Sequence, residues 1–407
     1  MADWIDAHAE DAIALLKEAV DIPSGTLNHD GVRAVGTVMR RELDALGFAT
    51  EWIDMPPEVD RAGHLVGRKG GSGRRFLLIG HLDTVFEEED GVRPFERQDG
   101  VARGHGVYDM KAGNTIIVYA LKALEEIGAL GDLPVVVAYM GDEEKYGRPV
   151  EVSRAALIEA GKWADVALGF EEAMYFDDTD WATVARRSSS GWVLTVTGVQ
   201  SHSSDIFSEA VGAGAIFEAG RILDRFYEEV RGEQNLTFNA GTIQGGTEVE
   251  YDPAGNRGKT FGKTNVVPRR VVVHGGIRAI SQDQLDRARE EMRRIVADNL
   301  PQTSATIEFG DGYPPMSPTD GNMALAEELS AINVALGRKP MPPLDPSKRG
   351  AADISFVAPY TDALAGLGGI GGGGHTPDEH LRLESLPLAI KRAAILIYRL
   401  GRNDSGD

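Results

Sequence analysis

The pattern of hydrophobic and polar positions alternates between helical and strand periods in the first half of the chain. Apolar positions spaced three and four residues apart predict helices at 3–20, 30–46, 110–128 and near 150–161. Apolar runs that end at Gly or charged residues predict strands near 49–54 and 63–68, and buried strands at 74–80, 133–140 and 165–170. We interpret the charged, glycine-containing segment 86–103 as a loop with room for a β-hairpin. This alternation is typical of an α/β fold in which a parallel-rich mixed sheet has helices on both faces.

A different order begins after the polar run 188–191, which we interpret as a hinge. The pattern that follows predicts strand, helix, strand, strand, helix and strand in turn, at 191–199, 208–230, 236–244, 264–273, 281–299 and 304–309. This is the order of a ferredoxin-like α+β domain. A turn is predicted at 310–315, after which helices and strands return. We therefore expect a discontinuous α/β domain at 1–189 and 311–407 that carries an inserted ferredoxin-like domain at 190–310.

Composition and charge limit the class of protein and its partners. The chain has 407 residues, 42% of them hydrophobic, which suffices for two domains with sizeable cores. Its net charge of −21 argues against nucleic acid or an anionic membrane as a partner. The absence of Cys excludes disulfides, thiolate metal ligands and cysteine nucleophiles. No signal peptide or membrane span is visible, so we expect a cytoplasmic protein; a leader removed before residue 1 is the alternative.

Acidic and imidazole side chains follow several of the predicted strands and turns. The carboxyl ends of parallel strands meet at one crevice, and carboxylates and imidazoles are common metal ligands. Taken singly, each group has an ordinary structural interpretation, such as a buried His–Asp pair, a helix N-cap, a solvated Glu pair or a flexible glycine loop. The side chains in question are His81, Asp83, Asp109, Glu143, Glu144, Glu171, Glu172 and His375.

Seven short motifs make the metal hypothesis much stronger than these single residues do. They are Gly-His-Leu-Asp-Thr-Val at 80–85, Gly-Val-Tyr-Asp-Met-Lys-Ala-Gly at 106–113, Gly-Asp-Glu-Glu at 141–144, Phe-Glu at 170–171, Ser-His-Ser at 201–203, Thr-Asn-Val-Val-Pro at 264–268 and Gly-His at 374–375. In order and spacing they resemble the di-zinc exopeptidases of metallopeptidase family 20. That family includes glutamate carboxypeptidases, aminoacylases and succinyl-diaminopimelate desuccinylases. The resemblance covers nearly the whole chain and implies a catalytic domain of the zinc exopeptidase type.

The resemblance also implies a ligand set for two Zn²⁺ ions per subunit, which Co²⁺ or Mn²⁺ can replace. Asp109 would bridge the two ions. His81 and Glu171 would complete one site, and Glu144 and His375 the other. A shared carboxylate is physically reasonable because two cations roughly 3.5–4 Å apart repel one another.

Catalytic roles follow from the same resemblance. Glu143 would be the general base that takes a proton from water, and Asp83 would orient the neighbouring imidazole. Glu172 is a rival for one ligand position. We favour Glu171 because it directly follows Phe170, the last residue of a predicted strand.

The inserted domain supplies the remaining expected site residues. The resemblance implies that His202 donates a hydrogen bond to the oxyanion in a partner subunit's site, within a homodimer formed through 190–310. It also implies that Asn265 and Arg278 contact the carbonyl or carboxylate of the substrate. Arg is well suited to a carboxylate because its planar fork gives a bidentate bond.

Two positions depart from the family pattern. Tyr313 stands where many members, the glutamate-specific ones among them, have an Arg, which weakens the case for an acidic side chain in the substrate. Lys348 and Arg349 could compensate for the missing cation. His105 stands where Arg is frequent. Neither departure touches the expected zinc ligands.

The sequence therefore predicts a zinc-dependent hydrolase that cleaves an amide bond next to a free carboxylate, as a carboxypeptidase acting on small peptides. An N-acyl-amino-acid amidohydrolase is the alternative. A non-catalytic binding protein on the same scaffold is a distant one, since it would require loss of Glu143 or of a ligand. A nucleotide-dependent enzyme or a serine hydrolase is disfavoured because neither a Gly-x-x-x-x-Gly-Lys-Ser/Thr loop nor a Gly-x-Ser-x-Gly elbow occurs.

Overall fold

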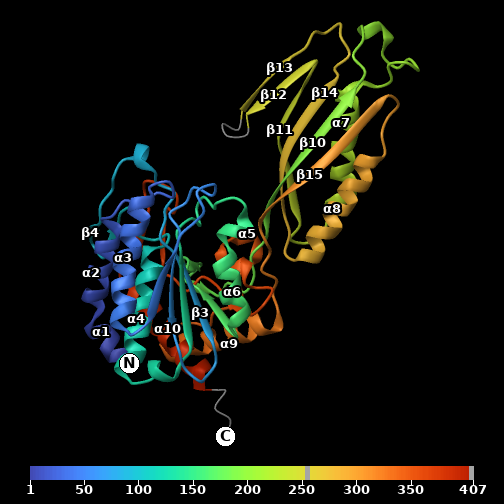
Figure 1. Ribbon diagram of the computed structural model, residues 1–407. Coiled ribbons are helices and arrows are strands. Elements are labelled where there is room, and N and C mark those ends of the chain that lie inside the picture. The colour runs from blue at the N-terminus through green and yellow to red at the C-terminus, as the bar shows by residue number, and fades with distance from the viewer. Residues whose placement is uncertain (253–256, 403–407) are drawn as a thin grey trace. The chain divides into compact units, whose positions relative to one another are not determined.

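The computed structural model describes residues 1–252 and 257–402 (Figure 1). The chain forms two compact units. Unit 1 comprises Met1–Ala185, Met316–Lys348 and the described residues from Ala352 onward. Unit 2 comprises Arg186–Pro315 and Arg349–Ala351. Each unit has its own sheet.

Unit 1 is built around a six-stranded mixed sheet. Its strands, in spatial order, are β1 (Ala49–Ile53), β2 (His64–Lys69), β6 (Val135–Met140), β3 (Phe76–His81), β7 (Val166–Gly169) and β16 (Asp362–Leu364). The last four run parallel to one another, whereas β1 and β2 pair antiparallel at one edge. Every residue of β3 and β6 is buried, as expected of strands covered on both faces. The predicted parallel-rich mixed sheet is confirmed.

Helices cover this sheet on both faces. Figure 1 shows α3 and α4 on one side of the sheet and α5 and α6 on the other. Two predicted helices are each divided in two, because His8 and Arg154 have backbone angles outside the helical range. The helices of unit 1 are α1 (Ala2–Ala7), α2 (Ala9–Val20), α3 (His29–Ala45), α4 (Lys111–Glu126), α5 (Val150–Ser153), α6 (Ala155–Trp163), α9 (Asp320–Ala335) and α10 (Ser385–Arg402).

A small second sheet brings distant segments of unit 1 together. The loop at 86–103 contains the hairpin of β4 (Glu96–Gln98) and β5 (Val101–Arg103), and β5 pairs with β18 (His380–Arg382). In turn, β18 pairs with β17 (Gly371–Gly372), which ends three residues before His375. A further hairpin, β8 (Met174–Phe176) with β9 (Thr179–Trp181), was not predicted.

Unit 2 is a four-stranded antiparallel sheet with two helices. The strand order is β11 (Thr237–Gly246), β14 (Arg270–Arg278), β10 (Ser189–Gly198) and β15 (Thr303–Tyr313). The helices α7 (Gly214–Arg225) and α8 (Gln282–Ala297) follow β10 and β14 and lie on the same face of the sheet (Figure 1). This is the predicted ferredoxin-like order. Its core includes Trp192, Leu194, Phe226, Val273 and Met292.

Four boundaries in unit 2 were predicted wrongly. The strand expected from 264 begins only at Arg270, because Val266 closes a turn onto Lys263 and Pro268 has no N–H for the ladder. The turn expected at 310–315 is largely strand, since β15 continues until Tyr313 pairs with the strand residue Ser189. The same strand, β10, includes most of the expected hinge 188–191. The helix expected from 208 begins six residues later and ends in a π-helical turn, Phe226–Val230.

A hairpin at the edge of unit 2 was missed altogether. It pairs β12 (Glu248–Asp252) with β13 (Arg257–Phe261). The alternation of Val249 and Tyr251 with acidic residues is a short strand signal that the prediction overlooked, whereas the partner strand β13 is largely polar and exposed throughout and carries little signal.

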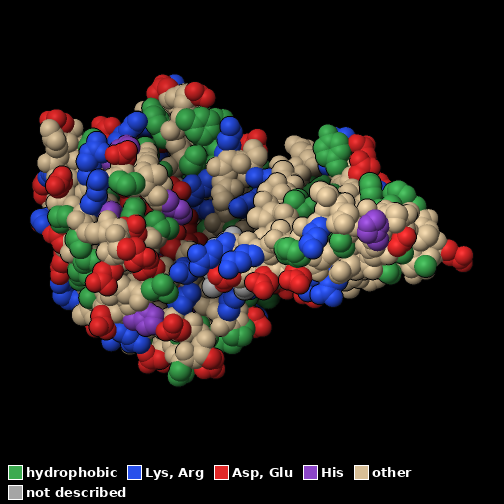
Figure 2. Space-filling model, turned by 90° about the horizontal axis from the view of Figure 1, so that it is seen from above, with side chains coloured by type: hydrophobic (Ala, Val, Ile, Leu, Met, Phe, Trp, Pro, Cys, Tyr) green, Lys and Arg blue, Asp and Glu red, His purple; other side chains and the backbone are tan. Residues whose placement is uncertain are grey.

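On the face shown in Figure 2, the charged side chains are dispersed. Acidic side chains are spread over the face in Figure 2 among Lys and Arg residues. The net charge of −21 thus does not gather in one patch on that face. No helix among the described residues is long and apolar enough to cross a membrane.

Candidate metal centre

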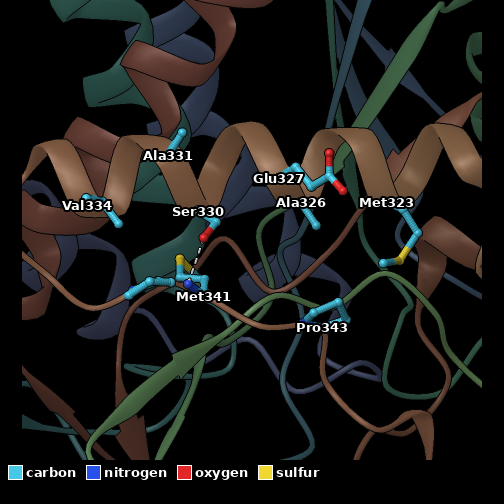
Figure 3. A pocket seen from close by; sticks show the side chains of 9 residues that line it. Met323, Ala326, Glu327, Ser330, Ala331, Val334, Met341 and Pro343 are labelled. Atoms are coloured by element: carbon cyan, nitrogen blue, oxygen red, sulfur yellow. Dashed lines mark hydrogen bonds between the residues drawn. The ribbon is translucent and has the colours of Figure 1, made fainter.

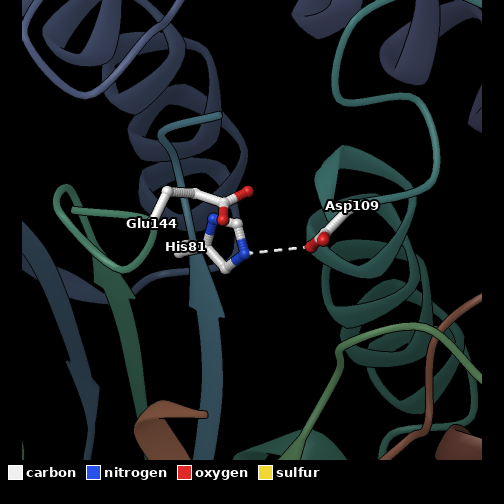
Figure 4. Close-up of side chains that lie close together, drawn as sticks. All are labelled: His81, Asp109 and Glu144. Carbon is white, nitrogen blue, oxygen red and sulfur yellow. Dashed lines mark hydrogen bonds and ion pairs between the residues drawn. The ribbon is translucent and has the colours of Figure 1, made fainter. Parts of the chain in front are cut away.

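The predicted ligand residues follow the strands of unit 1 at their carboxyl ends. His81 is the last residue of β3, Glu144 lies in the turn after β6, and Glu171 follows β7. Asp109 lies just before α4. Figure 4 shows His81 and Asp109 turned toward one another, with Glu144 beside the imidazole. The parallel sheet therefore collects residues from four separate segments in one place, as its topology predicts.

Asp109 lies between the two histidines. Its Oδ1 is 3.2 Å from His81 Nε2, and its Oδ2 is 3.1 Å from His375 Nε2. The same His375 nitrogen is 3.1 Å from Glu144 Oε2, while His81 Nε2 is 3.9 Å from Glu171 Oε1. The five side chains thus form two groups that share one carboxylate. This is the arrangement expected of a residue that serves two cations at once.

The orientation of the His81 ring is set by Asp83. His81 Nδ1 is 3.0 Å from the Asp83 carbonyl oxygen and 3.4 Å from Asp83 Oδ1. A proton on Nδ1 can be donated to the Asp83 carbonyl, and in that tautomer Nε2 has its lone pair for a ligand. The shorter of the two contacts from Asp83 to the imidazole is made by its backbone carbonyl.

The Asp83 carboxylate has a second function, which is to hold the turn after β6. Its Oδ1 accepts a hydrogen bond from the amide of Glu143 at 3.0 Å, and its Oδ2 accepts one from the amide of Glu144 at 3.1 Å. The Thr26 hydroxyl donates to Oδ2 at 2.7 Å. The turn that carries both glutamates is therefore tied to the end of β3.

The loop that carries Asp109 is supported by a residue that sequence reasoning missed. Glu379 is buried, and its carboxylate accepts hydrogen bonds from the amides of Gly106, Tyr108 and Asp109 at 2.8–2.9 Å. Burial raises the pKa of Glu379 to about 7, against the effect of these amides. In the sequence it stands between Asp378 and His380 in a polar stretch that looks solvated, and no local signal marks it.

Burial and the closeness of other acidic groups disfavour the ionised form of the glutamates at the site. Burial, reinforced by Asp109, raises the pKa of Glu144 to about 7 in spite of its contact with His375. Burial and the nearby Glu171 raise the pKa of Glu143 well above its usual range. The hydrogen bonds to Asp109 and Glu144 raise the pKa of His375 to about 11. Several acids thus compete for few protons, which favours a cation at this position.

The residues fit a metal site on two further observations. Glu144 Oε1 is buried and has no hydrogen-bond partner among the described residues, so an acceptor is left for a ligand. Imidazole nitrogen and carboxylate oxygen are also the ligands that Zn²⁺, Co²⁺ and Mn²⁺ accept. Three groups of potential ligand atoms lie within 4.8 Å of one another, namely His81–Asp109–Glu144, His81–Glu143–Glu171 and Asp109–Glu171–Glu172. The last group keeps Glu172 open as a rival ligand.

The other predicted site residues lie in unit 2. His202 and Asn265 are close together, since His202 forms a bridge with Val266 and the amide of Ser203 donates to the Asn265 carbonyl at 3.0 Å. His202 Nδ1 is 2.8 Å from the Ser204 hydroxyl.

The third predicted residue of unit 2 is far from this pair. Arg278 ends the nine-residue strand β14, whereas Asn265 precedes its start. At about 3.3 Å per residue the two ends of β14 are roughly 26 Å apart. Within unit 2 the structure therefore brings together two of the three residues and not the third.

Unit 1 also has an apolar groove that is not part of this site. It has a volume of about 510 Å³ and runs along α9 (Figure 3). Its wall includes Met323, Ala326 and Val334, and Met341, whose amide donates to the Ser330 hydroxyl at 2.9 Å. None of the lining residues is a predicted ligand or catalytic residue.

Comparison with known proteins identifies the family. Residues 77–399 match the sequence profile of peptidase family M20/M25/M40. The chain belongs to this family. It is therefore a hydrolytic enzyme of a metal-dependent peptidase family, and the resemblance found from its motifs is confirmed.

Relatives of this M20 peptidase have several activities. It is 26% identical to carboxypeptidase G2 of Pseudomonas sp. (strain RS-16) over 402 residues, which are 96% of this chain and 89% of that one. It is 33% identical to succinyl-diaminopimelate desuccinylase of Acidiphilium cryptum (strain JF-5) over 199 residues, 47% of this chain and 50% of that one.

Solved structures share the fold of the M20 peptidase. Aminopeptidase PepT from Bacillus cereus ATCC 10987 has a TM-score of 0.71 at 16% identity, with 96% of this chain and 98% of that one covered. The YXEP protein of Bacillus subtilis, a dinuclear metal-binding peptidase of the M20 family, has a TM-score of 0.64 at 16% identity, with 98% and 99% covered. The predicted fold class is thereby confirmed.

Proposed function

We propose that this M20 peptidase is a carboxypeptidase that uses two Zn²⁺ ions to hydrolyse the amide bond next to the free carboxylate of a small peptide. The observation that carries the proposal is the position of Asp109, whose two oxygens face two different histidines beside Glu143 and Glu144. The similarity to carboxypeptidase G2 over nearly the whole chain supports the choice of a carboxypeptidase.

The ligand residues divide between the two ions. Asp109, His81 and Glu171 would hold one ion, and Asp109, Glu144 and His375 the other. Such ions, when bound, polarise a carbonyl group and lower the pKa of a water molecule toward about 7. The protein's part is to fix the ligands, and the bonds of Asp83 and Glu379 to the surrounding amides do this.

Glu143 performs the proton transfers in this proposal. It takes a proton from the attacking water as the water oxygen bonds to the amide carbon. It then delivers that proton to the leaving nitrogen as the C–N bond breaks, so that the products are a carboxylic acid and a free amine. The hydrogen bond from its amide to Asp83 keeps its backbone in one place during both steps.

We further propose a homodimer in which His202 completes the site of the partner subunit. The length of β14 supports this, because Arg278 and the pair His202–Asn265 lie at opposite ends of a strand roughly 26 Å long. A single active site can include residues from both ends of β14 only if the two ends belong to different chains.

The edge of the unit 2 sheet offers a surface for this dimer. Strand β11 lies at the edge, and its Ile243 is 58% exposed. On the adjoining helix α7, Ile216 and Phe217 are 50% and 58% exposed. An exposed edge strand with apolar neighbours can pair with its two-fold mate.

The released amino acid need not be glutamate. Tyr313 is buried at the end of β15 and supplies no cation for an acidic side chain. Lys348 and Arg349 are the cations that could replace the missing Arg. We therefore propose a preference for neutral or apolar C-terminal residues.

An N-acyl-amino-acid amidohydrolase is the second candidate. It uses the same ligands and the same base, and the similarity to a succinyl-diaminopimelate desuccinylase favours it. One panel separates the two candidates: C-terminally varied dipeptides and N-acyl amino acids, assayed with Zn²⁺ and after chelation. Faster cleavage of the dipeptides supports the carboxypeptidase, faster cleavage of the acyl compounds supports the alternative, and no cleavage of either class refutes both.

A further inference from the structure

A buried arginine lies beneath the turn that carries Glu143 and Glu144, outside the ligand set. Arg154 separates α5 from α6, and its side chain is fully buried. Its Nη1 is 2.5 Å from Asp142 Oδ1, and its Nε is 2.7 Å from Asp353 Oδ1. One guanidinium therefore bridges two buried carboxylates that lie 211 positions apart in the numbering of the chain (353 minus 142). The planar fork of an Arg side chain suits this role because its donors point in fixed, separate directions.

Asp142 connects Arg154 to the turn that carries Glu143 and Glu144. It directly precedes Glu143, and its Oδ2 accepts hydrogen bonds from the amide of Gly147 and the hydroxyl of Ser153, each at 2.7 Å. Arg154 Nη2 donates in addition to the Asp142 carbonyl at 3.1 Å. The two ends of the segment 142–147 are thus held from one side by Asp142 and Arg154. The Asp83 carboxylate holds the amides between them.

Asp353 depends on the same arginine. Its Oδ2 is buried and has no hydrogen-bond partner within the described part of the chain. Burial raises the pKa of Asp353 to about 6 even though Arg154 acts against it. Asp353 is also close enough that its charge contributes to the raised pKa of Glu143. Without the guanidinium, two buried acids would lose their counter-charge directly beside the base.

We propose that Arg154, together with Asp142 and Asp353, is a positioning device that holds Glu143 at the distance and angle needed for proton transfer. The proposal rests on the proposed function, because it presupposes that Glu143 is the base. None of the three residues touches the substrate or the metal in this role. They act through the backbone of the turn. A displacement of about 1 Å at a catalytic group can lower the rate by ~10².

The test compares Arg154→Lys and Asp353→Asn with a matched control. Lys keeps the positive charge and loses the fork, and Asn keeps the shape and one acceptor. Arg392→Lys is the control, since Arg392 is also buried in unit 1 and pairs with Asp180 at 2.8 Å and with Asn333. It serves no part of the catalytic turn. If Arg154→Lys does not fold, Asp353→Asn carries the test.

Two measurements are made on each variant. The first is kcat and KM at saturating metal, with metal content checked by elemental analysis. The second is hydrogen exchange of the Glu143 and Glu144 amides in the metal-free protein, because both amides donate to Asp83 and their protection reports how firmly the turn is held. We expect kcat to fall by about 10–100-fold with KM within about twofold, and exchange to become about tenfold faster. Arg392→Lys should change neither quantity.

Several results would overturn the positioning role. One is a wild-type kcat and wild-type exchange in folded, metal-loaded Arg154→Lys and Asp353→Asn. Another is full recovery of kcat with excess metal, which would place the effect on metal affinity. If Arg392→Lys loses as much kcat as the test variants, the loss is a general effect of changing a buried charge. If the wild-type chain hydrolyses no substrate, the proposed function fails by itself, and the exchange comparison still decides whether Arg154 holds the turn.

Discussion

The division of labour between Glu143 and Glu144 is the sharpest test of the site. Both lie in groups of atoms able to hold a metal, Glu143 with His81 and Glu171, and Glu144 with His81 and Asp109. The proposed mechanism makes Glu143 the base and Glu144 a ligand. The substitutions Glu143→Gln and Glu144→Gln remove one negative charge each at nearly constant volume, so they separate the two roles.

The structure sets the expected magnitudes. Loss of a general base typically lowers kcat by ~10²–10⁴, whereas metal content should stay near that of the wild type because no ligand is lost. Glu144 makes its contact to His375 at 3.1 Å, and its second oxygen is buried without a partner among the described residues. Since even residues that only support ligands cost ~10–100-fold in metal affinity, loss of Glu144 should cost at least that much.

The assay measures both quantities on the same samples. Each variant is dialysed against buffers of fixed free Zn²⁺, its metal content is determined by elemental analysis, and its kcat is then measured at saturating substrate. Excess Zn²⁺ should restore part of the activity of Glu144→Gln and none of that of Glu143→Gln. If Glu143→Gln loses its metal while Glu144→Gln retains it, the two roles have been assigned the wrong way round.

Four further predictions follow from the site and its surroundings. Chelation should abolish hydrolysis and Zn²⁺, Co²⁺ or Mn²⁺ should restore it; full turnover in protein shown to be metal-free would refute the metal site. Mixed dimers of His202→Ala and Glu143→Ala chains should regain activity, and no recovery after proven subunit exchange would place His202 in its own chain's site or outside catalysis. Because Tyr313 supplies no cation, dipeptides ending in glutamate should be cleaved no faster than those ending in neutral residues, and a strong glutamate preference would contradict this. Burial lowers the pKa of His64, whose Nδ1 accepts a hydrogen bond from the Gly141 amide, so the unfolded state binds more protons below pH ~6.5. The free energy of unfolding should therefore fall there by up to about 1.4 kcal/mol per pH unit. Urea unfolding at several pH values should show that the free energy of unfolding declines less for His64→Asn than for the wild type. Equal slopes in the two proteins would refute this prediction.

Much of the fold could be predicted because it depends on local periods and chain direction. The buried runs of β3 and β6 are continuous in the sequence, and a parallel sheet follows from strands that alternate with helices. Once the strands run parallel, their carboxyl ends must meet at one edge. His81, Glu144 and Glu171 could therefore be grouped from the sequence alone.

Local sequence signals gave wrong predictions where backbone pairing between strands decided the structure. Gly310 and Gly312 are typical turn residues, yet they lie in a strand because β15 gains ladder hydrogen bonds to β10 as far as Tyr313. The valines at 266–267 look like a strand, yet the Pro that follows them has no N–H to donate.

The sequence by itself determined most of the helices and strands of the two main sheets and which strand ends carry acids and imidazoles. Only the tertiary structure decided what holds those groups in place. Glu379 reaches the amide of Asp109 across 270 positions, and Arg154 reaches Asp353 across 199. In the sequence these residues look like ordinary solvent-exposed charged residues. They become supports of the site because folding buries them, and a buried carboxylate or guanidinium must find a donor, an acceptor or a counter-charge wherever the chain brings one.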